Sequence, residues 1–336
     1  MTGSVCGSLG TYSRIYTYQQ ANLQAFILLR VTASELLDMV EALEIPPLIR
    51  TRNQYIFDSV EALALTLARF RSAGDQYDLS MRFNRSQSSI SEIVNWVVTH
   101  VDERWQHLLE FDYKHLLSPA NLETYAQAIH RTGAPLTGVW GFIDCTIRRI
   151  CRPSMWQRAA YSGHKKFHAL KFQAVMLPNG MFGHLFGPWE ARRADSFLLD
   201  QSGLLEMCAE HAVRDGTNEN TPAEERFLQL FGDPAYGVSH QIVSPFAGPG
   251  VRTEEEKGWN EAMASVRIEV EHGFGIVSNT WPFLNAGWKM HIYSSPVGRY
   301  YRAGVLFTNA INCFRYNQVA QYFECQPPNL FDYFHD

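Results

Sequence analysis

Apolar residues recur at spacings of three and four positions from residue 31 to about residue 127, which is the period of an amphipathic helix. The pattern is clearest in "SVEALALTLARF" at 59–70 and in "SISEIVNWVVTHV" at 89–101. We therefore predict that the first part of the chain is all-α.

The stretch "DQYDLSMRFNRSQSSISEIVNWVV" predicts two helices joined by a short turn at Asn84 and Arg85. The second helix would begin at Ser86 or at the S-x-x-E motif that follows it. This pair fits a helix-turn-helix, although contacts with DNA phosphates would depend on Arg82 and Arg85 because the second helix begins without Lys or Arg. A helical bundle that only packs on the rest of the protein is an equal alternative.

The pattern changes after the turn-rich segment "GAPLTG" at 133–138, so we place a domain boundary there and predict domains at 1–132 and 133–336. The segments that follow alternate or run apolar, and the turn "PNG" separates two of them as in a β-hairpin. The predicted elements are strands at 139–150, 166–177 and 181–187, a helix near 194–213, strands ending at Asp233 and at 240–244, and a long helix at 254–280 ended by Pro282. This order is a mixed α/β layout.

Composition narrows the class of protein. The 336 residues carry a net charge of −5, which argues against binding nucleic acid through bulk positive charge and directs attention to local basic patches. Six cysteines form no C-x-x-C pair, so we expect a reducing compartment, the nucleus or the cytoplasm. No apolar run approaches the roughly 18 residues of a membrane span, and we expect a protein that is neither secreted nor inserted in a membrane.

Three acidic positions occur at informative places in this layout. Asp144 interrupts the first apolar strand, Asp233 follows the fourth, and the long helix carries Glu269 and Glu271. Carboxylates that converge at a sheet edge repel one another unless a positive charge lies between them. Mg²⁺ and Mn²⁺ prefer carboxylate oxygens, and a pair of such ions is the usual clamp for phosphodiester cleavage. The pattern therefore indicates a hard-cation site.

Each acid also has an ordinary structural interpretation. Asp144 would pair with Arg148 or Arg149, Asp233 would form a turn before a proline, and Glu271 would pair with Arg267 one helical turn away. Taken singly, these interpretations are as good as the functional one. Together they weaken, because all three acids would have to fall on matching positions by accident.

Five segments in order resemble the nuclease domain of PIF/Harbinger transposases, a DDE superfamily domain with the RNase H-like fold. They are "GFIDCT", "YSGHKKFHALKFQAVMLPNGMF", "ADSFLL" with "SGLL", "GDPAYG" and "VRIEVEHGFGIV", which span roughly residues 136–312. The resemblance implies an RNase H-like mixed α/β domain that cleaves DNA with Mg²⁺ or Mn²⁺, with strand transfer as a further activity. It assigns the metal ligands to Asp144, Asp233 and Glu271.

The family pattern R-x-x-x-E-x-x-F-G selects Glu271 over Glu269 by counting from Arg267. Helix geometry agrees that only one of the two can face the sheet, since positions two apart point about 200° away from each other. Gly273 and Gly275 each disfavour a helix by about 1 kcal/mol, which indicates a close backbone approach on the turn after Glu271.

Other positions match the family less closely. Asp195 matches a further family acid and is a second-tier metal ligand, although an acid at a helix N-terminus is its ordinary interpretation. Cys145 stands where the family usually has Gly, Ala194 where it has His, and Pro-Ala follows Asp233. These departures keep a rival open, namely a domesticated, catalytically silent descendant that binds DNA or protein.

The segment from 145 to 175 is basic and contains no acid, which is typical of a surface that holds DNA phosphates without reading sequence. A lysine-protected strand edge is the alternative. We predict DNA contacts from Arg148, Arg152, Lys165, Lys166 and, on the long helix, Arg267. The resemblance further implies a separate Myb-like DNA-binding partner, and a homo-oligomer is a further expectation.

Overall fold

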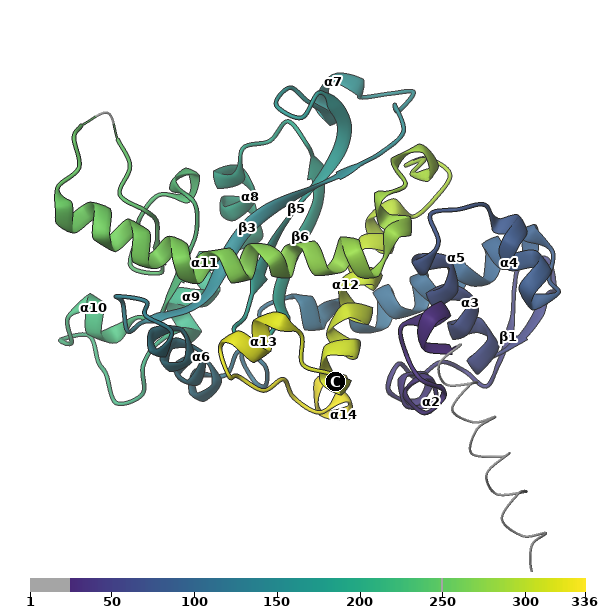
Figure 1. Ribbon diagram of the computed structural model, residues 1–336, viewed down its shortest axis with the longest axis horizontal. Coiled ribbons are helices and arrows are strands. Elements are labelled where there is room, and N and C mark those ends of the chain that lie inside the picture. Colours follow the sequence, from purple (N-terminus) through teal and green to yellow (C-terminus); the bar gives the residue numbers. More distant parts are fainter. Residues whose placement is uncertain (1–24, 249) are drawn as a thin grey trace, which may run out of the picture. The chain divides into compact units, whose positions relative to one another are not determined.

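The computed structural model describes residues 25–248 and 250–336, apart from the side chains of Glu224, residues 269–272 and Phe274 (Figure 1). The chain divides into two compact units, Met1–His100 and Val101–Asp336. The division precedes the boundary that we predict at 132/133, because α6 (Pro119–Arg131) packs on strand β3 (Val139–Arg149). The change of pattern at 133 thus marks where the strands of the second unit begin.

The first unit is mostly helical, as predicted, but it is not all-α. A two-stranded antiparallel sheet of β1 (Leu48–Arg50) and β2 (Ile56–Asp58) lies in it. Strands of three residues are too short for alternation to appear in the sequence. The helices of this unit are α2 (Ala33–Ala42), α3 (Ser59–Arg71), α4 (Gln76–Phe83) and α5 (Gln87–Trp105), the last of which runs on across the division.

Helices α4 and α5 are joined by the predicted short turn. Asn84 ends α4 in the left-handed conformation, with φ of 50°. Ser86 begins α5, because its Oγ accepts a hydrogen bond from the Ser89 N–H at 3.2 Å. Arg85 donates two hydrogen bonds to Glu61, at 2.7 and 2.6 Å, and is thereby held inside the unit. A DNA-binding role for this helix pair stays a prediction.

The second unit is built on a mixed six-stranded sheet, in agreement with the predicted α/β layout. Strands β3 and β5 pair antiparallel, β5 also pairs with β6, and β3, β7 and β8 run parallel. The strands after β3 are β4 (Tyr161–Ser162), β5 (Phe167–Met176), β6 (Phe182–Glu190), β7 (Gln229–Phe231) and β8 (Ile242–Val243). The predicted hairpin is therefore confirmed as β5 and β6.

Helices flank this sheet on both sides (Figure 1). The long helix α11 (Glu254–Thr280) has the predicted bounds, and its Thr253 forms a capping box with Glu256. The single helix predicted at 194–213 is two helices, because Gly203 adopts φ of 64° between them. The remaining helices are α7 (Gln157–Ala160), α8 (Asp195–Ser202), α9 (Leu204–His211), α10 (Ala223–Arg226), α12 (Val297–Phe314), α13 (Gln318–Tyr322) and α14 (Leu330–Tyr333).

Helix α11 passes close to the sheet at one glycine. A Cβ atom on Gly273 would lie 2.8 Å from Met176 Cε and 3.2 Å from Val319 Cγ2. Gly273 therefore lets the helix backbone approach β5 and α13, as predicted for the turn after Glu271. The same expectation is wrong for Gly275, where a Cβ would lie an ordinary 3.8 Å from Asn279 Nδ2.

Candidate active site

Two carboxylates lie at the same offset on neighbouring parallel strands, Asp144 within β3 and Asp233 just after β7. Phe142 of β3 is paired in register with Phe231 of β7. Asp144 comes two residues after Phe142, and Asp233 comes two residues after Phe231. Equal offsets from a paired position put the two acids side by side at the end of β7, while β3 runs on to Arg149. Consistent with this, the charge on Asp233 is one cause of the raised pKa of Asp144.

Asp144 is a partly buried carboxylate in a mixed electrostatic setting. Its Oδ1 accepts a hydrogen bond from the Cys145 N–H at 2.7 Å, and its Oδ2 lies 3.5 Å from Arg267 Nη2 on α11. Burial is the main cause that raises the pKa of Asp144, whereas the Arg267 charge opposes the rise. The negative charges of Asp233 and Asp195 raise this pKa further. A site of this kind favours an added cation.

Asp233 is fixed by a tight local turn. Its side chain accepts a hydrogen bond from the Ala235 N–H at 2.9 Å and caps the short 3₁₀ helix η2 (Pro234–Tyr236). A Cβ on Gly232 would lie 2.7 Å from the Tyr236 ring and 2.9 Å from Ile143. The glycine and tyrosine of the G-D-x-x-Y motif therefore pack against each other and hold Asp233 between them. The Pro-Ala that departs from the family pattern forms the turn.

The opposite face of the strands carries a second set of groups. Cys145 points away from the Asp144 face, since successive side chains of a strand alternate. It accepts a hydrogen bond from the Tyr236 hydroxyl at 3.3 Å, and burial raises the pKa of its thiol. The thiol therefore stays neutral, and Cys145 adds no charge where the family usually has Gly.

Asp195 lies on this second face as well. Lys171, which is paired across the strands with Ile147, donates from Nζ to Asp195 Oδ1 at 2.6 Å and to the Arg193 carbonyl at 2.6 Å. Asp195 is thus neutralised by a buried lysine, and it also begins helix α8. The candidate metal ligands are therefore Asp144, Asp233 and Glu271, and Asp195 is not one of them.

For the third acid, Glu269 or Glu271, only the position of its helix is described. Glu269 and Glu271 lie in α11, but their side chains fall outside the described part of the structure. Arg267, one turn earlier on the same helix, contacts Asp144, so this segment of α11 passes over the Asp144 face. The contact between Arg267 and Asp144 joins residues 123 positions apart, and no pattern in the sequence indicates it.

Besides Arg267, which contacts Asp144, the predicted DNA-contacting residues divide into two groups. Arg148 is held inside the protein by Ser278, by Thr146 and by the Tyr301 hydroxyl, and its guanidinium stacks 4.6 Å from the Tyr301 ring centroid. Arg152, Lys165 and Lys166 are exposed.

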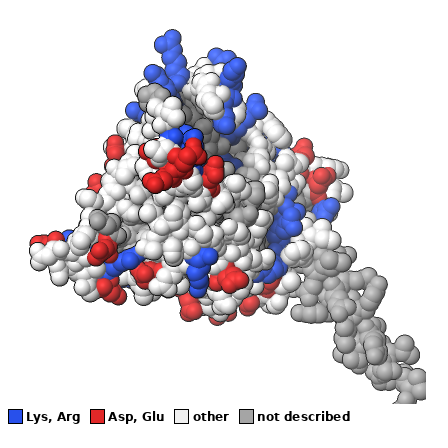
Figure 2. Space-filling view, turned by 60° about the vertical axis from the view of Figure 1, so that its left-hand side comes forward, with Lys and Arg blue, Asp and Glu red and all other residues white. Residues whose placement is uncertain are grey.

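The exposed basic surface extends beyond the predicted segment. Lys and Arg side chains gather at the top of the molecule in Figure 2, at the height where Figure 1 places α7. Arg158, Arg192 and Arg193 are exposed in this region too, and Arg158 and Arg192 line one cavity together with Arg152. Arg192 and Arg193 follow β6 and were not predicted, since the sequence does not show that β6 returns to this edge. The buried position of Lys171 was not predicted either. Its sequence signal is that it is a single cation within the otherwise apolar centre of β5.

The described carboxylates suit Mg²⁺ or Mn²⁺. Asp144 and Asp233 offer only oxygen donors, which is the chemistry that these ions prefer. Within the side chains that the structure describes, Asp144, Asp195 and Asp233 do not gather three ligand oxygens within 4.8 Å of one another. Glu271 on α11 is the further ligand that the sequence pattern selects, and its side chain lies outside the described part of the structure.

In the described part of the chain, no helix combines the length and the apolar character that a membrane crossing requires.

Comparison with known proteins gives one match, to a family model. No curated protein and no solved structure matches the chain significantly. The family model of the DDE superfamily endonucleases matches residues 143–303, a range that begins one residue before Asp144 and includes Asp233 and α11. Residues 143–303 of this chain are therefore a domain of the DDE superfamily endonuclease family.

Proposed function

We propose that this protein is a divalent-metal-dependent DNA endonuclease of the PIF/Harbinger transposase type, with Asp144, Asp233 and Glu271 as its DDE triad. The observation that carries the proposal is the equal offset of Asp144 and Asp233 from the paired residues Phe142 and Phe231. This offset brings two carboxylates side by side at the end of β7, within the range that matches the endonuclease family. A purely structural use of both acids would not require it.

Each residue of the proposed site has a defined role. Asp144 and Asp233 would hold Mg²⁺ or Mn²⁺ from rigid backbone, and Glu271 would complete the set from α11. Arg267 orients the Asp144 carboxylate through its contact at 3.5 Å. When bound, the ions supply Lewis-acid activation of water or of a DNA 3′-hydroxyl and stabilise the leaving oxygen.

DNA would lie along the exposed basic surface. Arg152, Lys165 and Lys166 are exposed to phosphates, although Arg152 also donates two hydrogen bonds to Gln157, whereas Arg148 supports the fold from inside. Contacts of this kind position DNA without reading its sequence. Selectivity would then come from a separate Myb-like DNA-binding partner, from the α4 and α5 pair, or from a homo-oligomer that binds two sites. Action on DNA agrees with the localisation that we expect, the nucleus, the cytoplasm or both.

The central test is a plasmid-nicking assay in Mg²⁺ and in Mn²⁺. Asp144→Asn and Asp233→Asn should each abolish nicking, because an amide cannot supply the anionic oxygen that a hard cation requires. Asp195→Asn is the matched control and should retain nicking. Circular dichroism must show that all three variants are folded. Nicking in excess chelator, or undiminished nicking by either triad variant, would refute the metal mechanism.

The choice of glutamate is tested in the same assay. Glu271→Gln should eliminate nicking, while Glu269→Gln should leave it nearly intact, because the two side chains point in different directions from α11. The reverse result would show that Glu269, and not Glu271, is the glutamate of α11 that faces the site. If the wild type binds Mn²⁺ and DNA but never nicks, the silent-descendant alternative holds.

DNA affinity tests the basic surface. Binding by the isolated chain should be weak and should fall steeply with salt, because it rests on phosphate contacts. Changing both Lys165 and Lys166 to Gln should reduce the slope of log K against log salt by about 1.8, at roughly 0.9 for each lost phosphate contact. Lys257→Gln, on the first turns of α11, is the control. Tight, sequence-selective binding at physiological salt would instead identify the α4 and α5 pair as the reader.

A further inference from the structure

A cluster of metal-ligating side chains lies outside the proposed nuclease site. Asp112 and His115 lie in the loop that follows the 3₁₀ helix η1 (Gln106–Leu109), and His335 follows α14. One ligand atom from each of these residues lies within 4.8 Å of the other two. All three positions fall outside the residues that match the endonuclease family.

The hydrogen bonds of His335 determine which of its nitrogens is available. Nδ1 lies 2.9 Å from the carbonyl oxygen of Asp332, and a carbonyl can only accept, so Nδ1 carries the proton. In the neutral ring, Nε2 then presents a lone pair. That lone pair faces Asp112 Oδ2 at 3.5 Å, so two acceptors point at each other. A cation between them, either a second proton or a metal ion, removes the conflict.

The Asp112 carboxylate is held in a fixed position, as a cation ligand must be. Its Oδ2 accepts a hydrogen bond from the Leu116 N–H at 2.9 Å, and its Oδ1 accepts one from the His115 N–H at 3.3 Å. The side chain is only 11% exposed. His115 Nδ1 lies 3.3 Å from Oδ1, and the two imidazole rings have centroids 3.7 Å apart.

The spacing of the donors agrees with a tetrahedral metal ion. Arms of about 2.0 to 2.1 Å, as in zinc sites, place neighbouring donor atoms about 3.3 Å apart. His115 Nδ1 lies 3.3 Å from Asp112 Oδ1 and His335 Nε2 lies 3.5 Å from Asp112 Oδ2, so each imidazole faces a different oxygen of the one carboxylate at about this spacing. Two imidazoles and a carboxylate are also the donors that zinc accepts, whereas Mg²⁺ prefers an all-oxygen set.

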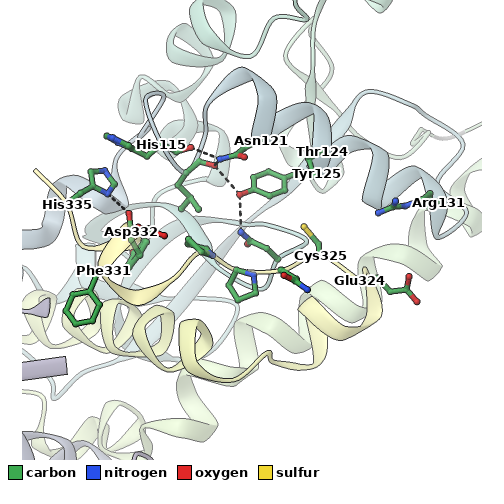
Figure 3. Close-up of a pocket in the computed structure, with 16 residues that line it drawn as sticks. His115, Asn121, Thr124, Tyr125, Arg131, Glu324, Cys325, Phe331, Asp332 and His335 are labelled. Atoms are coloured by element: carbon green, nitrogen blue, oxygen red, sulfur yellow. Dashed lines mark hydrogen bonds between the residues drawn. The ribbon is translucent and has the colours of Figure 1, made fainter. Parts of the chain in front are cut away.

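We propose that Asp112, His115 and His335 form a Zn²⁺ site with a fourth position left for water. His115 and His335 lie at one end of a cavity of about 740 Å³, which Tyr125, Asn121 and Cys325 line further along (Figure 3). The fourth position therefore has access to solvent through that cavity. The Asp332 carbonyl orients the ring of His335, as outer-shell groups do at zinc sites. The ion would join the 112–116 loop to the segment after α14.

The test is Zn²⁺ binding by the metal-free full chain, measured by competition with a chromogenic chelator in excess Mg²⁺. Magnesium occupies the proposed nuclease site but competes poorly for imidazole. His115→Ala and His335→Ala should each weaken the tight site by more than the roughly 10- to 100-fold that loss of an outer-shell group brings. His115 has a side chain 49% exposed, so its variant should fold. His164→Ala, an exposed histidine elsewhere, is the control.

Two further measurements make the result decisive. Cys151 Sγ lies 3.4 Å from His291 Nε2 and is a competing two-donor site, so the titrations are repeated in a Cys151→Ser background. Co²⁺ should give the visible absorption band of a tetrahedral complex, which His115→Ala removes. Equal Zn²⁺ affinity in wild type, His115→Ala and His335→Ala would overturn the proposal. Nicking in Mg²⁺ should persist in His115→Ala, which separates this site from the nuclease.

Discussion

Lys171→Met should lower the free energy of unfolding by about 3 kcal/mol. Lys171 Nζ makes contacts of 2.6 Å with Asp195 Oδ1 and with the Arg193 carbonyl, and its side chain is 9% exposed. Removing one partner of a buried ion pair leaves the other charge uncompensated, which destabilises a protein by about 3 to 5 kcal/mol. We expect the lower end because Asp195 is 23% exposed and water reaches it.

A double-mutant cycle separates the ion pair from general damage. Asp195→Asn and the double variant Lys171→Met/Asp195→Asn are compared with each single change by urea unfolding. The coupling energy should be about 2 kcal/mol, since removing both charges leaves neither unpaired. Lys165→Met, an exposed change near the same strand, should stay within about 0.5 kcal/mol of wild type. Hydrogen exchange of β5 and α8 reports whether the loss is local.

The same variants test the role of Asp195 in the metal set. If the role of Asp195 is to neutralise Lys171, Asp195→Asn leaves the Mn²⁺ affinity close to that of wild type, whereas Asp144→Asn lowers it sharply. The reasoning fails if Lys171→Met unfolds like wild type with no coupling to Asp195. It also fails if Asp195→Asn and Asp144→Asn lose Mn²⁺ to the same degree, because Asp195 would then be a ligand.

Three more predictions follow from charge and packing. Arg267→Gln removes the cation that opposes the raised pKa of Asp144, so the acid limb of Mn²⁺ binding, measured by titration at several pH values, should move to higher pH; an unchanged limb would contradict this. Burial lowers the pKa of His184 to about 4. Since the unfolded chain gains this proton below about pH 6.5 and the native chain does not, stability should fall by about 3 kcal/mol between pH 6.5 and 4. His184→Phe should flatten that part of the urea-derived pH profile, and an equally steep profile would rule out His184 as the source. Gly273→Ala should destabilise the fold by about 1 to 3 kcal/mol through its contacts with β5, while Gly275→Ala should gain up to about 1 kcal/mol in thermal unfolding; equal effects would show that α11 is not close to the sheet at Gly273.

Local signals in the sequence were sufficient for most elements. The bounds of α11 follow from a helical period that ends before Pro282, and this stop signal acts within one turn of the helix. The β5 and β6 hairpin follows from the turn at "PNG". Asp144 and Asp233 stood out because an acid beside an apolar strand is unusual. Such features depend on residues close together in the chain, and the sequence displays them directly.

Tertiary structure alone decided which charges meet. Arg148 was a candidate partner for Asp144, yet it contacts Ser278, which is 130 residues away, and Arg267 takes its place. Asp195 pairs with Lys171 because strand alternation and the position of α8 put both on the face opposite Asp144. The sheet register and the packing of α8, α11 and α12 on it determine these contacts. They join segments whose separation in the sequence carries no periodic signal, so only the folded chain reveals them.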